Sequence, residues 1–175
     1  MFPELTTDRL FFRQFQDNDL GRVFEALSHP KVIPHYGVQY DTMEACKEQM
    51  TWFASLETQK TGRWWAICSK DNTTFYGGGG FNNWDHEHQK AEVGFWLLPA
   101  FWGRGYMQEG MRAICDYAFR HMGIHRIEGF VESNNINCKR AMEKLDFQLE
   151  GCMRDCEKKD GRFISLDIYA SINPL

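Results

Sequence analysis

The chain has 175 residues, of which 43% are hydrophobic and 25% are charged, and its formal net charge is −4. This size and composition fit one compact domain over residues 1–175, because no linker-like or low-complexity run divides the sequence. The acidic balance argues against a protein that grips nucleic acid through a basic face, and no apolar run has the form of a signal peptide or approaches the roughly 18 residues of a membrane span. We therefore expect a cytosolic protein with neither nucleic acid nor membrane as a partner.

The cysteines and histidines do not indicate a disulfide framework or a metal site. The six cysteines are scattered and form no C-x-x-C pair, which argues against disulfides in a chain of this size. In "DHEHQK", His86 and His88 lie beside Asp85 and Glu87, but no second cluster with metal-ligand spacing occurs elsewhere. We expect a solvated turn there and no bound metal.

The first half of the chain predicts a strand, two helices and two antiparallel strands. "LTTDRLFFRQF" alternates as one opening strand, and Asp17 is the expected cap of a helix over "DNDLGRVFEALS". Asp41 is the expected cap of a second helix. Its buried stripe is expected at Met43, Cys46, Met50 and Phe53. The strands "RWWAICSK" and "TFYGGGGFNNW" follow, and the run of glycines from 77 to 80 indicates a bulge or a close backbone approach more than a phosphate site.

The second half predicts alternating strands and helices and then a hairpin. "AEVGFWLL" reads as a strand that ends at Pro99, and a helix follows the glycine turn and ends near Gly123. "RIEGFVES" is a strand, "NNINCKRAMEKLDF" a helix, and the chain closes in a hairpin around Asp160 and Gly161. Because a helical crossover separates strand 91–98 from strand 126–132, these two should run parallel within an otherwise antiparallel sheet. The fold class is therefore a mixed α/β sheet.

The turn "FWGRGYMQEG" is the strongest local indication of a ligand. It follows a strand and opens a helix, whose first backbone N–H groups are unpaired and carry a partial positive charge. Gly103 and Gly105 let an anion come close, and Arg104 adds a permanent cation. The turn lacks the Lys-Ser/Thr pair of a Walker loop and has Gln108 where a dinucleotide fingerprint has its third glycine. A phosphate is the natural guest, although a ligand-free tight turn would use the same residues.

Three segments together resemble one family. "AEVGFWLLPAFWGRGYMQEG", "NNINCKRAMEKLDFQLEG" and "MRDCEKKDGRFISLDIY" occur in the order found in the GNAT acetyltransferase superfamily, and they most resemble its RimJ/RimL-type branch of ribosomal-protein N-terminal acetyltransferases. The resemblance runs from "LTTDRLFFRQF" to "DIYA". It implies the GNAT fold: a mixed, mostly antiparallel sheet with a central splayed parallel pair and helices on both faces. It also implies acetyl-CoA as the co-substrate, without a metal.

The resemblance implies a set of cofactor-binding residues. The pyrophosphate loop falls on residues 100–105, with Ala100 in place of the family's polar first residue. Pantetheine would pair with strand 91–98 through unpaired amides near its end. Asn135 matches an asparagine that contacts the cofactor, although it could instead cap the next helix. The implied cofactor residues are Leu97, Leu98, Gly103, Arg104, Gly105, Tyr106, Met107 and Asn135.

Two catalytic residues follow from the same resemblance. Glu92 matches a frequent glutamate in the family's strand and is the expected general base, acting on the acceptor ammonium through a water; the alternative is a structural acid paired with a basic residue. Cys138 stands where the family commonly has serine, so it is either the acid that returns a proton to the departing thiolate or a small packing residue. Met142 stands where many other branches have a tyrosine acid.

The expected acceptor is a protein or peptide N-terminal α-amine. An α-amine with a pKa near 8 has about a tenth of its molecules deprotonated at pH 7, so it needs only a weak base. Tyr36, Trp84 and Asp85 are the residues expected to line the acceptor groove, as aromatic and acidic groups suit a cationic chain end. The alternatives are a small amine, such as a polyamine or an aminoglycoside, and an inactive module that only binds coenzyme A. The sequence leaves the oligomeric state open, and a homodimer is compatible with it.

Overall fold

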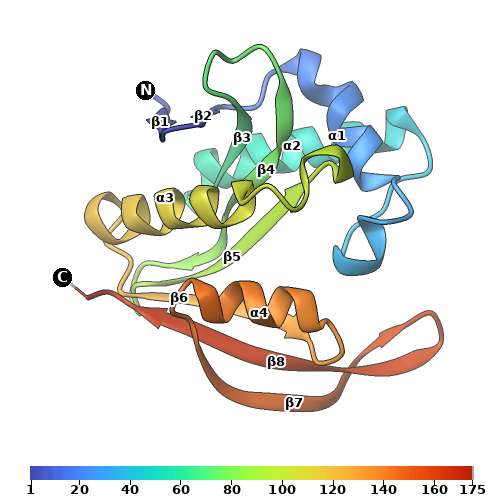
Figure 1. Ribbon diagram of the computed structural model, residues 1–175, viewed down its shortest axis with the longest axis vertical. Helices are drawn as coiled ribbons and strands as arrows, with labels where there is room; N and C mark the ends of the chain where they lie inside the picture. The colour runs from blue at the N-terminus through green and yellow to red at the C-terminus, as the bar shows by residue number, and fades with distance from the viewer. Residues whose placement is uncertain (175) are drawn as a thin grey trace.

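The protein folds as one mixed sheet with helices on both faces (Figure 1). A computed structural model describes residues 1–174. The eight strands lie in the order β1-β2-β3-β4-β5-β6-β8-β7. The elements are β1 (Leu5–Thr6), β2 (Leu10–Arg13), η1 (Asp17–Asp19), α1 (Leu20–Leu27), η2 (Ile33–His35), α2 (Met43–Gln59), β3 (Arg63–Ser69), β4 (Phe75–Asp85), β5 (Lys90–Leu97), η3 (Pro99–Phe101), α3 (Tyr106–His121), β6 (Arg126–Glu132), α4 (Ile136–Lys144), β7 (Gln148–Lys159) and β8 (Arg162–Ile172).

The pair β5 and β6 is parallel, whereas the other neighbouring strands run antiparallel. Its ladder begins where Lys90 faces Arg126 and ends where Glu92 faces Glu128. Beyond Glu92 the two strands diverge toward their carboxyl ends (Figure 1). The predicted mixed sheet with a splayed parallel pair is therefore confirmed. We call this gap in the strand pairing, between β5 and β6 beyond Glu92, the cleft; α3 follows the end of β5, and α4 follows the end of β6.

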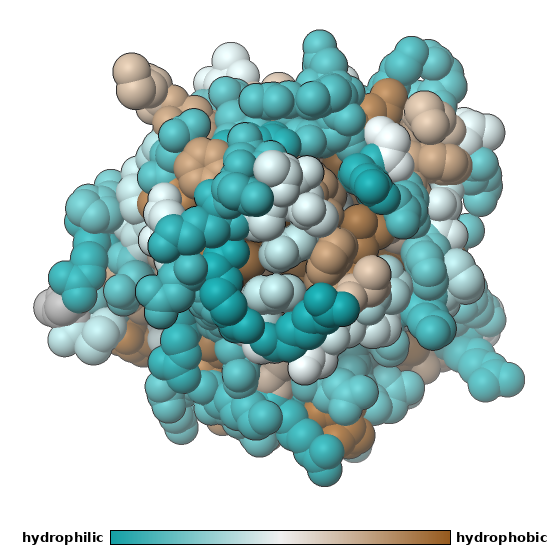
Figure 2. All heavy atoms as spheres, turned by 45° about the horizontal axis from the view of Figure 1, so that its top comes forward, coloured by the Kyte–Doolittle hydropathy of each residue, from teal (hydrophilic) through white to brown (hydrophobic). Residues whose placement is uncertain are grey.

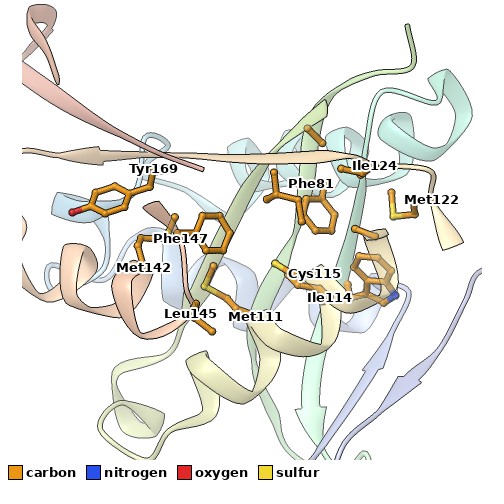
Figure 3. Packing of buried hydrophobic residues seen from close by; sticks show 14 of the residues in the cluster. Phe81, Met111, Ile114, Cys115, Met122, Ile124, Met142, Leu145, Phe147 and Tyr169 are labelled. Carbon is orange, nitrogen blue, oxygen red and sulfur yellow. The ribbon is translucent and has the colours of Figure 1, made fainter. Parts of the chain in front are cut away.

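Each face of the sheet has its own hydrophobic core. On one face α1 and α2 pack against Trp64, Trp96 and Leu98. On the other face α3 and α4 pack against Phe81, Ile127 and further strand residues, and Figure 3 shows these helix side chains turned toward the sheet. The face seen in Figure 2 is mostly hydrophilic, with apolar residues in small separate groups. None of the helices in residues 1–174 is long and apolar enough to cross a membrane.

The glycine run in β4 makes room for large side chains of the neighbouring strands. A Cβ atom on Gly79 would lie 2.5 Å from the ring of Phe95, and one on Gly80 would overlap the carbonyl oxygen of Arg63 and lie 2.6 Å from the Cα of Trp64. On β5, a Cβ on Gly94 would lie 2.5 Å from the indole of Trp64. The predicted close backbone approach is confirmed, and aromatic residues on both faces of the sheet depend on it.

The structure corrects the predicted start of the chain. The single opening strand is two short strands, β1 and β2, because the amide of Thr7 bonds to the carbonyl of Leu10 and reverses the chain. Asp17 does not cap the first helix. Asp19 instead accepts the amide of Gln16 at 2.8 Å, because the buried guanidinium of Arg13 holds the Asp19 carboxylate in place.

The second helix also begins one residue later than its predicted cap implied. Thr42, and not Asp41, accepts the amide of Ala45 at 3.1 Å. Met43 is then the first helical residue and is 48% exposed, so its place in the buried stripe was wrong. Cys46 and Phe53 are buried as predicted.

The ion pair between Arg13 and Asp19 gives a test of stability. Arg13 is 8% exposed and Asp19 5%, and their closest atoms lie 2.7 Å apart. Asp19→Asn should lower the free energy of unfolding by about 3 kcal/mol, because it leaves a buried guanidinium without its counter-charge. Urea unfolding measures the loss, and Glu25→Gln in the exposed pair Arg22–Glu25 is the control, with an expected change under about 1 kcal/mol. Similar losses in both variants would contradict this role of the buried pair.

Candidate active site

The edge of β5 supplies backbone groups to the cleft. The amide of Leu98 donates to the carbonyl of Tyr76 on β4 at 2.9 Å. The expectation of an unpaired amide at Leu98 was therefore wrong, because the hydrogen bonding to β4 continues one residue past Leu97, the last residue of β5. Because N–H groups alternate in direction along a strand, those of Phe95 and Leu97 face away from β4 and into the cleft. The carbonyl of Leu97 accepts a hydrogen bond from the indole of Trp102 at 2.8 Å.

The glycine turn forms an open cradle at the start of α3. Gly103 and Gly105 have φ values of 72° and 79°, a left-handed conformation that favours glycine. Gly105 is the N-cap of α3, and no side chain of residues 1–174 caps this end of the helix. Within the same described residues, nothing lies within 4 Å of a Cβ placed on Gly103. The first amides of α3, at Tyr106 and Met107, and the cation of Arg104 between the two glycines are thus groups of the kind that bind a phosphate.

Arg9 is a second cation at this turn, and no motif in the sequence indicates it. Its Nη1 donates to the carbonyl of Arg104 at 2.8 Å, and its guanidinium lies 4.6 Å from the centre of the Tyr106 ring. Arg9 also pairs with Glu109 in the first turn of α3 at 2.6 Å. This pairing offsets a carboxylate that would otherwise repel an anion at the helix N-terminus. Arg9 and Glu109 are far apart in the sequence, so only the fold reveals the contact.

The turn provides a test of coenzyme A binding. Gly105→Val should raise the Kd for coenzyme A at least about tenfold, because a side chain costs about 1–2 kcal/mol in this backbone conformation and crowds the cradle. Gly123→Val is the matched control: Gly123 also has a left-handed φ, 68°, but follows the other end of α3. Isothermal titration calorimetry on both variants measures the difference. An unchanged Kd in Gly105→Val would mean that the phosphates bind elsewhere.

Glu92 stands where β5 and β6 begin to separate. Its carboxylate accepts a hydrogen bond from Asn83 Nδ2 at 2.8 Å, and it has no ion pair among residues 1–174. Burial raises the pKa of Glu92, and the negative charges of Glu128 and Glu157 add to the effect, whereas the hydrogen bond from Asn83 opposes it. A carboxylate with a raised pKa binds a proton more readily near neutral pH than an exposed glutamate does.

Tyr36 is the one predicted acceptor residue that the structure brings close to Glu92. It follows the short η2 helix, and its ring centre lies 6.3 Å from that of Trp64. Burial raises the pKa of Tyr36, and the negative charge of Glu92 contributes to the rise. The loop between α1 and α2 thus places an aromatic hydroxyl within electrostatic range of the expected base.

Trp84 and Asp85 are not brought to this site. They lie at the turn between β4 and β5, where β5 and β6 are still paired. The ring centres of Trp84 and His86 lie 4.1 Å apart in a tilted arrangement, and Asp85 accepts a hydrogen bond from the amide of His88 at 2.9 Å. Asn83 has a φ of 52°, and the register of the ladder shifts there, so Trp84 turns to the face covered by α3.

Asn135 and Cys138 lie together at the start of α4. Asn135 Oδ1 accepts the amide of Cys138 at 3.1 Å, so Asn135 caps the helix, while its Nδ2 lies 3.2 Å from His35 Nδ1. Cys138 packs against the core under α4, and burial raises the pKa of its thiol. The thiol therefore stays protonated at neutral pH, which suits both the acid and the packing interpretation. A contact of Asn135 with the cofactor stays a prediction.

A pocket of about 630 Å³ adjoins the open end of the cleft. The loop between α1 and α2, the start of α4 and the tip of the β7–β8 hairpin form its walls, and Figure 1 shows these three segments on the same side of the molecule. Lys159 from the hairpin contacts both the carboxylate of Glu132 and the carbonyl of Pro34. Lys159 thereby joins the hairpin tip to the loop that carries Tyr36.

The "DHEHQK" turn is held by protein contacts. A ring nitrogen of His86 lies 2.7 Å from the carbonyl oxygen of Lys60. Within residues 1–174, no three His, Cys, Asp or Glu side chains gather as metal ligands.

Comparison with known proteins identifies the family. The model of the acetyltransferase (GNAT) domain matches residues 9–148. The chain belongs to the GNAT acetyltransferase family. Its curated relatives include the uncharacterized N-acetyltransferase YoaA of Bacillus subtilis (strain 168), which is 31% identical over 175 residues and covers 99% of each chain. The protein is accordingly an N-acetyltransferase.

Solved structures support the GNAT fold. RimL, a ribosomal L7/L12 α-N-protein acetyltransferase in complex with coenzyme A, superposes with a TM-score of 0.87 at 19% identity, covering 97% of this chain and 98% of RimL. Spermidine N-acetyltransferase from Vibrio cholerae, in complex with coenzyme A and spermine, gives 0.85 at 16% identity, covering 95% and 97%. Both neighbours bind coenzyme A, but they act on different amines.

Proposed function

We propose that this GNAT enzyme transfers an acetyl group from acetyl-CoA to the α-amine of a protein or peptide N-terminus, as the RimJ/RimL-type branch does. The observation that carries the proposal is Glu92, a partly buried carboxylate with a raised pKa and no ion pair in residues 1–174, at the point where β5 and β6 separate. We further propose that the chain works as a single cytosolic domain.

Residues of the chain are suited to hold acetyl-CoA in the cleft. The amides of Tyr106 and Met107, with Arg104, would bind the pyrophosphate, and the cleft-facing amides of Phe95 and Leu97 would bind the pantetheine arm and the thioester oxygen. Bound acetyl-CoA supplies an acetyl group activated as a thioester. Amides aimed at the oxygen that gains negative charge often provide the largest single contribution to catalysis.

Two side chains, Glu92 and Cys138, transfer the protons in this reaction. Glu92 takes a proton from the acceptor ammonium, directly or through a water, so that the free amine can attack the thioester carbon. As the C–N bond forms and the C–S bond breaks, Cys138 gives its proton to the departing sulfur, and its own high pKa then favours recovery of a proton from solvent. The nitrogen loses its second proton to water as the amide forms, and Glu92 releases the first proton to solvent before the next cycle.

The charges around the cleft favour an acceptor with a single positive charge. Glu128 pairs with Arg126 at 2.7 Å and with Lys90 at 3.7 Å, and Glu132 pairs with Lys159. These carboxylates are offset by cations of the protein, which leaves little surplus negative charge to attract a polycation. An α-amine also has a lower pKa than an alkyl amine, by about 2 units, so a modest base such as Glu92 suffices.

A small amine is the second candidate acceptor. The similarity in fold to spermidine N-acetyltransferase and the proximity of Glu157 to Glu92 favour it. A module that binds coenzyme A without transferring the acetyl group is the remaining alternative.

Product analysis by mass spectrometry tests the proposal. The protein is incubated with acetyl-CoA and a mixture of N-terminal peptides that contain lysine, polyamines and aminoglycosides, and fragmentation locates the acetyl group. We expect acetylation of the peptide α-amine and none of the lysine side chain. Acetylation of the polyamine or aminoglycoside alone would replace the proposed acceptor. No product from protein that binds acetyl-CoA would favour the binding module.

A further inference from the structure

Two buried hydrogen-bond donors on the face of the sheet that carries Glu92 have no acceptor of normal geometry within residues 1–174. The indole N–H groups of Trp64 and Trp96 are buried, and each has no hydrogen-bond partner within residues 1–174; both residues are 3% exposed. A buried donor left unpaired costs about 1–3 kcal/mol, and native proteins rarely keep one without a reason. Two such donors on one face of the sheet indicate a ligand that accepts hydrogen bonds.

The donors lie on the face of the sheet that carries the expected base. Glu92, Gly94 and Trp96 alternate onto the same face of β5, about 6.6 Å apart from one to the next. The indole of Trp64 reaches across β4 and lies over Gly94, the position between Glu92 and Trp96. The indole of Trp64, from β3, thus lies over the line of residues Glu92, Gly94 and Trp96 on this face of β5.

Tyr36 covers this line of residues from the loop between α1 and α2. Its ring contacts Trp64, and the charge of Glu92 and the indole N–H of Trp96 both influence the pKa of its hydroxyl, in opposite directions. Glu92 and the indole of Trp96 both lie near enough to the Tyr36 hydroxyl to shift its pKa. The contact between Trp96 and this hydroxyl nevertheless lacks the geometry of a hydrogen bond. A hydrogen-bond acceptor on a ligand bound beneath Tyr36 would give the indole N–H groups of Trp64 and Trp96 the partner they lack.

We propose that the indole N–H groups of Trp64 and Trp96 bind the carbonyl oxygen of the acceptor's first residue and so determine specificity for α-aminoacyl chain ends. The inference rests on the proposed function and extends it by naming the carbonyl group next to the reacting amine as the part of the acceptor that the enzyme recognises. A carbonyl oxygen accepts two hydrogen bonds, which matches the two donors. In an α-aminoacyl group the carbonyl is bonded to the carbon that bears the amine, so the oxygen can reach the indoles while the amine faces Glu92.

The same donors discriminate against acceptors that lack a carbonyl at this place. A polyamine has only methylene groups and further ammonium donors beyond its reacting amine, so both indoles would stay unsatisfied. A site with buried polar groups rejects an analogue that cannot pair with them far more strongly than an apolar pocket rejects a missing methylene. The two tryptophans therefore separate the two acceptor classes that the fold alone allows.

Three variants and three acceptors test the inference. The variants are Trp64→Phe, Trp96→Phe and the control Trp52→Phe, whose ring lies 5.7 Å from that of Trp64 in the same aromatic cluster. The acceptors are a peptide that begins with alanine, the same peptide with β-alanine first, which moves the carbonyl one carbon away, and spermidine. Loss of one donor should lower kcat/KM for the alanine peptide about tenfold, mainly through KM, with changes under about threefold for the other two acceptors. Trp52→Phe should change all three acceptors by a similar, small factor.

A modified peptide tests the same contact in the unaltered protein. A thioamide in place of the first peptide bond keeps the shape of the acceptor but accepts hydrogen bonds poorly. It should lower kcat/KM in the wild-type protein and have a smaller effect in Trp64→Phe, where the donor is already absent. The loss in the wild-type protein can be measured even if a tryptophan variant folds poorly.

The outcomes separate this inference from the proposed function. Equal losses for all three acceptors in the Trp64 and Trp96 variants would overturn the inference, because they would mean a packing role or a bound water. A wild-type protein that prefers spermidine or the β-alanyl peptide would overturn the inference and leave acetyl transfer intact. A protein that binds acetyl-CoA but acetylates none of the amines would overturn the proposed function itself, and the inference with it.

Discussion

Replacing Glu92 with Gln is expected to lower kcat about 10²- to 10³-fold, because the amide has the size of the carboxylate but cannot accept a proton from the acceptor ammonium. Glutamine can still accept the hydrogen bond that Asn83 donates at this position, so the strand should keep its geometry. The affinity for acetyl-CoA should not change, because the implied cofactor groups lie further along β5 and at the glycine turn. Steady-state kinetics and calorimetry measure the two quantities separately.

The pH profile of the same variant tests the role of Glu92 as a base. Since burial raises its pKa, Glu92 becomes protonated at a higher pH than an ordinary glutamate, and kcat/KM should fall as the pH drops through that raised pKa. Glu92→Gln should lose this acidic limb. Glu157→Gln is the matched control: removal of its negative charge should move the limb to lower pH with little change in the maximal rate. An acidic limb that is identical in wild type and Glu92→Gln would rule out Glu92 as the base.

Gly80→Val is expected to cause the largest loss of stability. A Cβ at Gly80 would overlap the carbonyl oxygen of Arg63 and lie 2.6 Å from the Cα of Trp64, and backbone cannot move aside without breaking the ladder between β3 and β4. We expect a loss of more than about 4 kcal/mol in the free energy of unfolding, enough to leave little folded protein. Soluble yield and urea unfolding measure the effect.

Gly151→Val is the control for this substitution. Gly151 also lies in a strand, β7, but nothing lies within 4 Å of a Cβ placed on it. Its stability should change by less than about 1 kcal/mol. Equal stability of the two variants would contradict the account of the glycine run as space for the neighbouring strands and their aromatic side chains.

The sequence predicted the features that depend on local pattern. The glycine turn lies where a strand gives way to a helix, and the crossover between strands 91–98 and 126–132 predicted their parallel pairing. These features follow from turn chemistry and from the handedness of crossovers, which need no knowledge of distant contacts.

The errors arose where a side-chain contact or a backbone irregularity decides the structure and the hydrophobic pattern does not. Asp19 and not Asp17 holds the start of the first helix because Arg13 draws its carboxylate inward. Trp84 turned away from the cleft because a left-handed residue at Asn83 shifts the register, which alternation cannot foresee. Arg9 reaches the glycine turn across the fold, and no spacing in the sequence points to it.

The aromatic residues beside Glu92 were missed for a related reason. Trp64 appears in the sequence as an ordinary strand residue, and its position over β5 depends on the missing side chains of Gly80 and Gly94. A run of glycines opposite large aromatic residues is a usable signal, because the glycines mark where a bulky side chain crosses the sheet.

A crystal structure of the complex with coenzyme A tests the central claim most directly, that the cleft between β5 and β6 is the site of acetyl transfer. We predict the pyrophosphate at the amides of residues 105–107, the pantetheine arm along the cleft-facing edge of β5, and the sulfur between Glu92 and Cys138. Coenzyme A bound outside the cleft, or with its sulfur remote from Glu92, would contradict the assignment of the site.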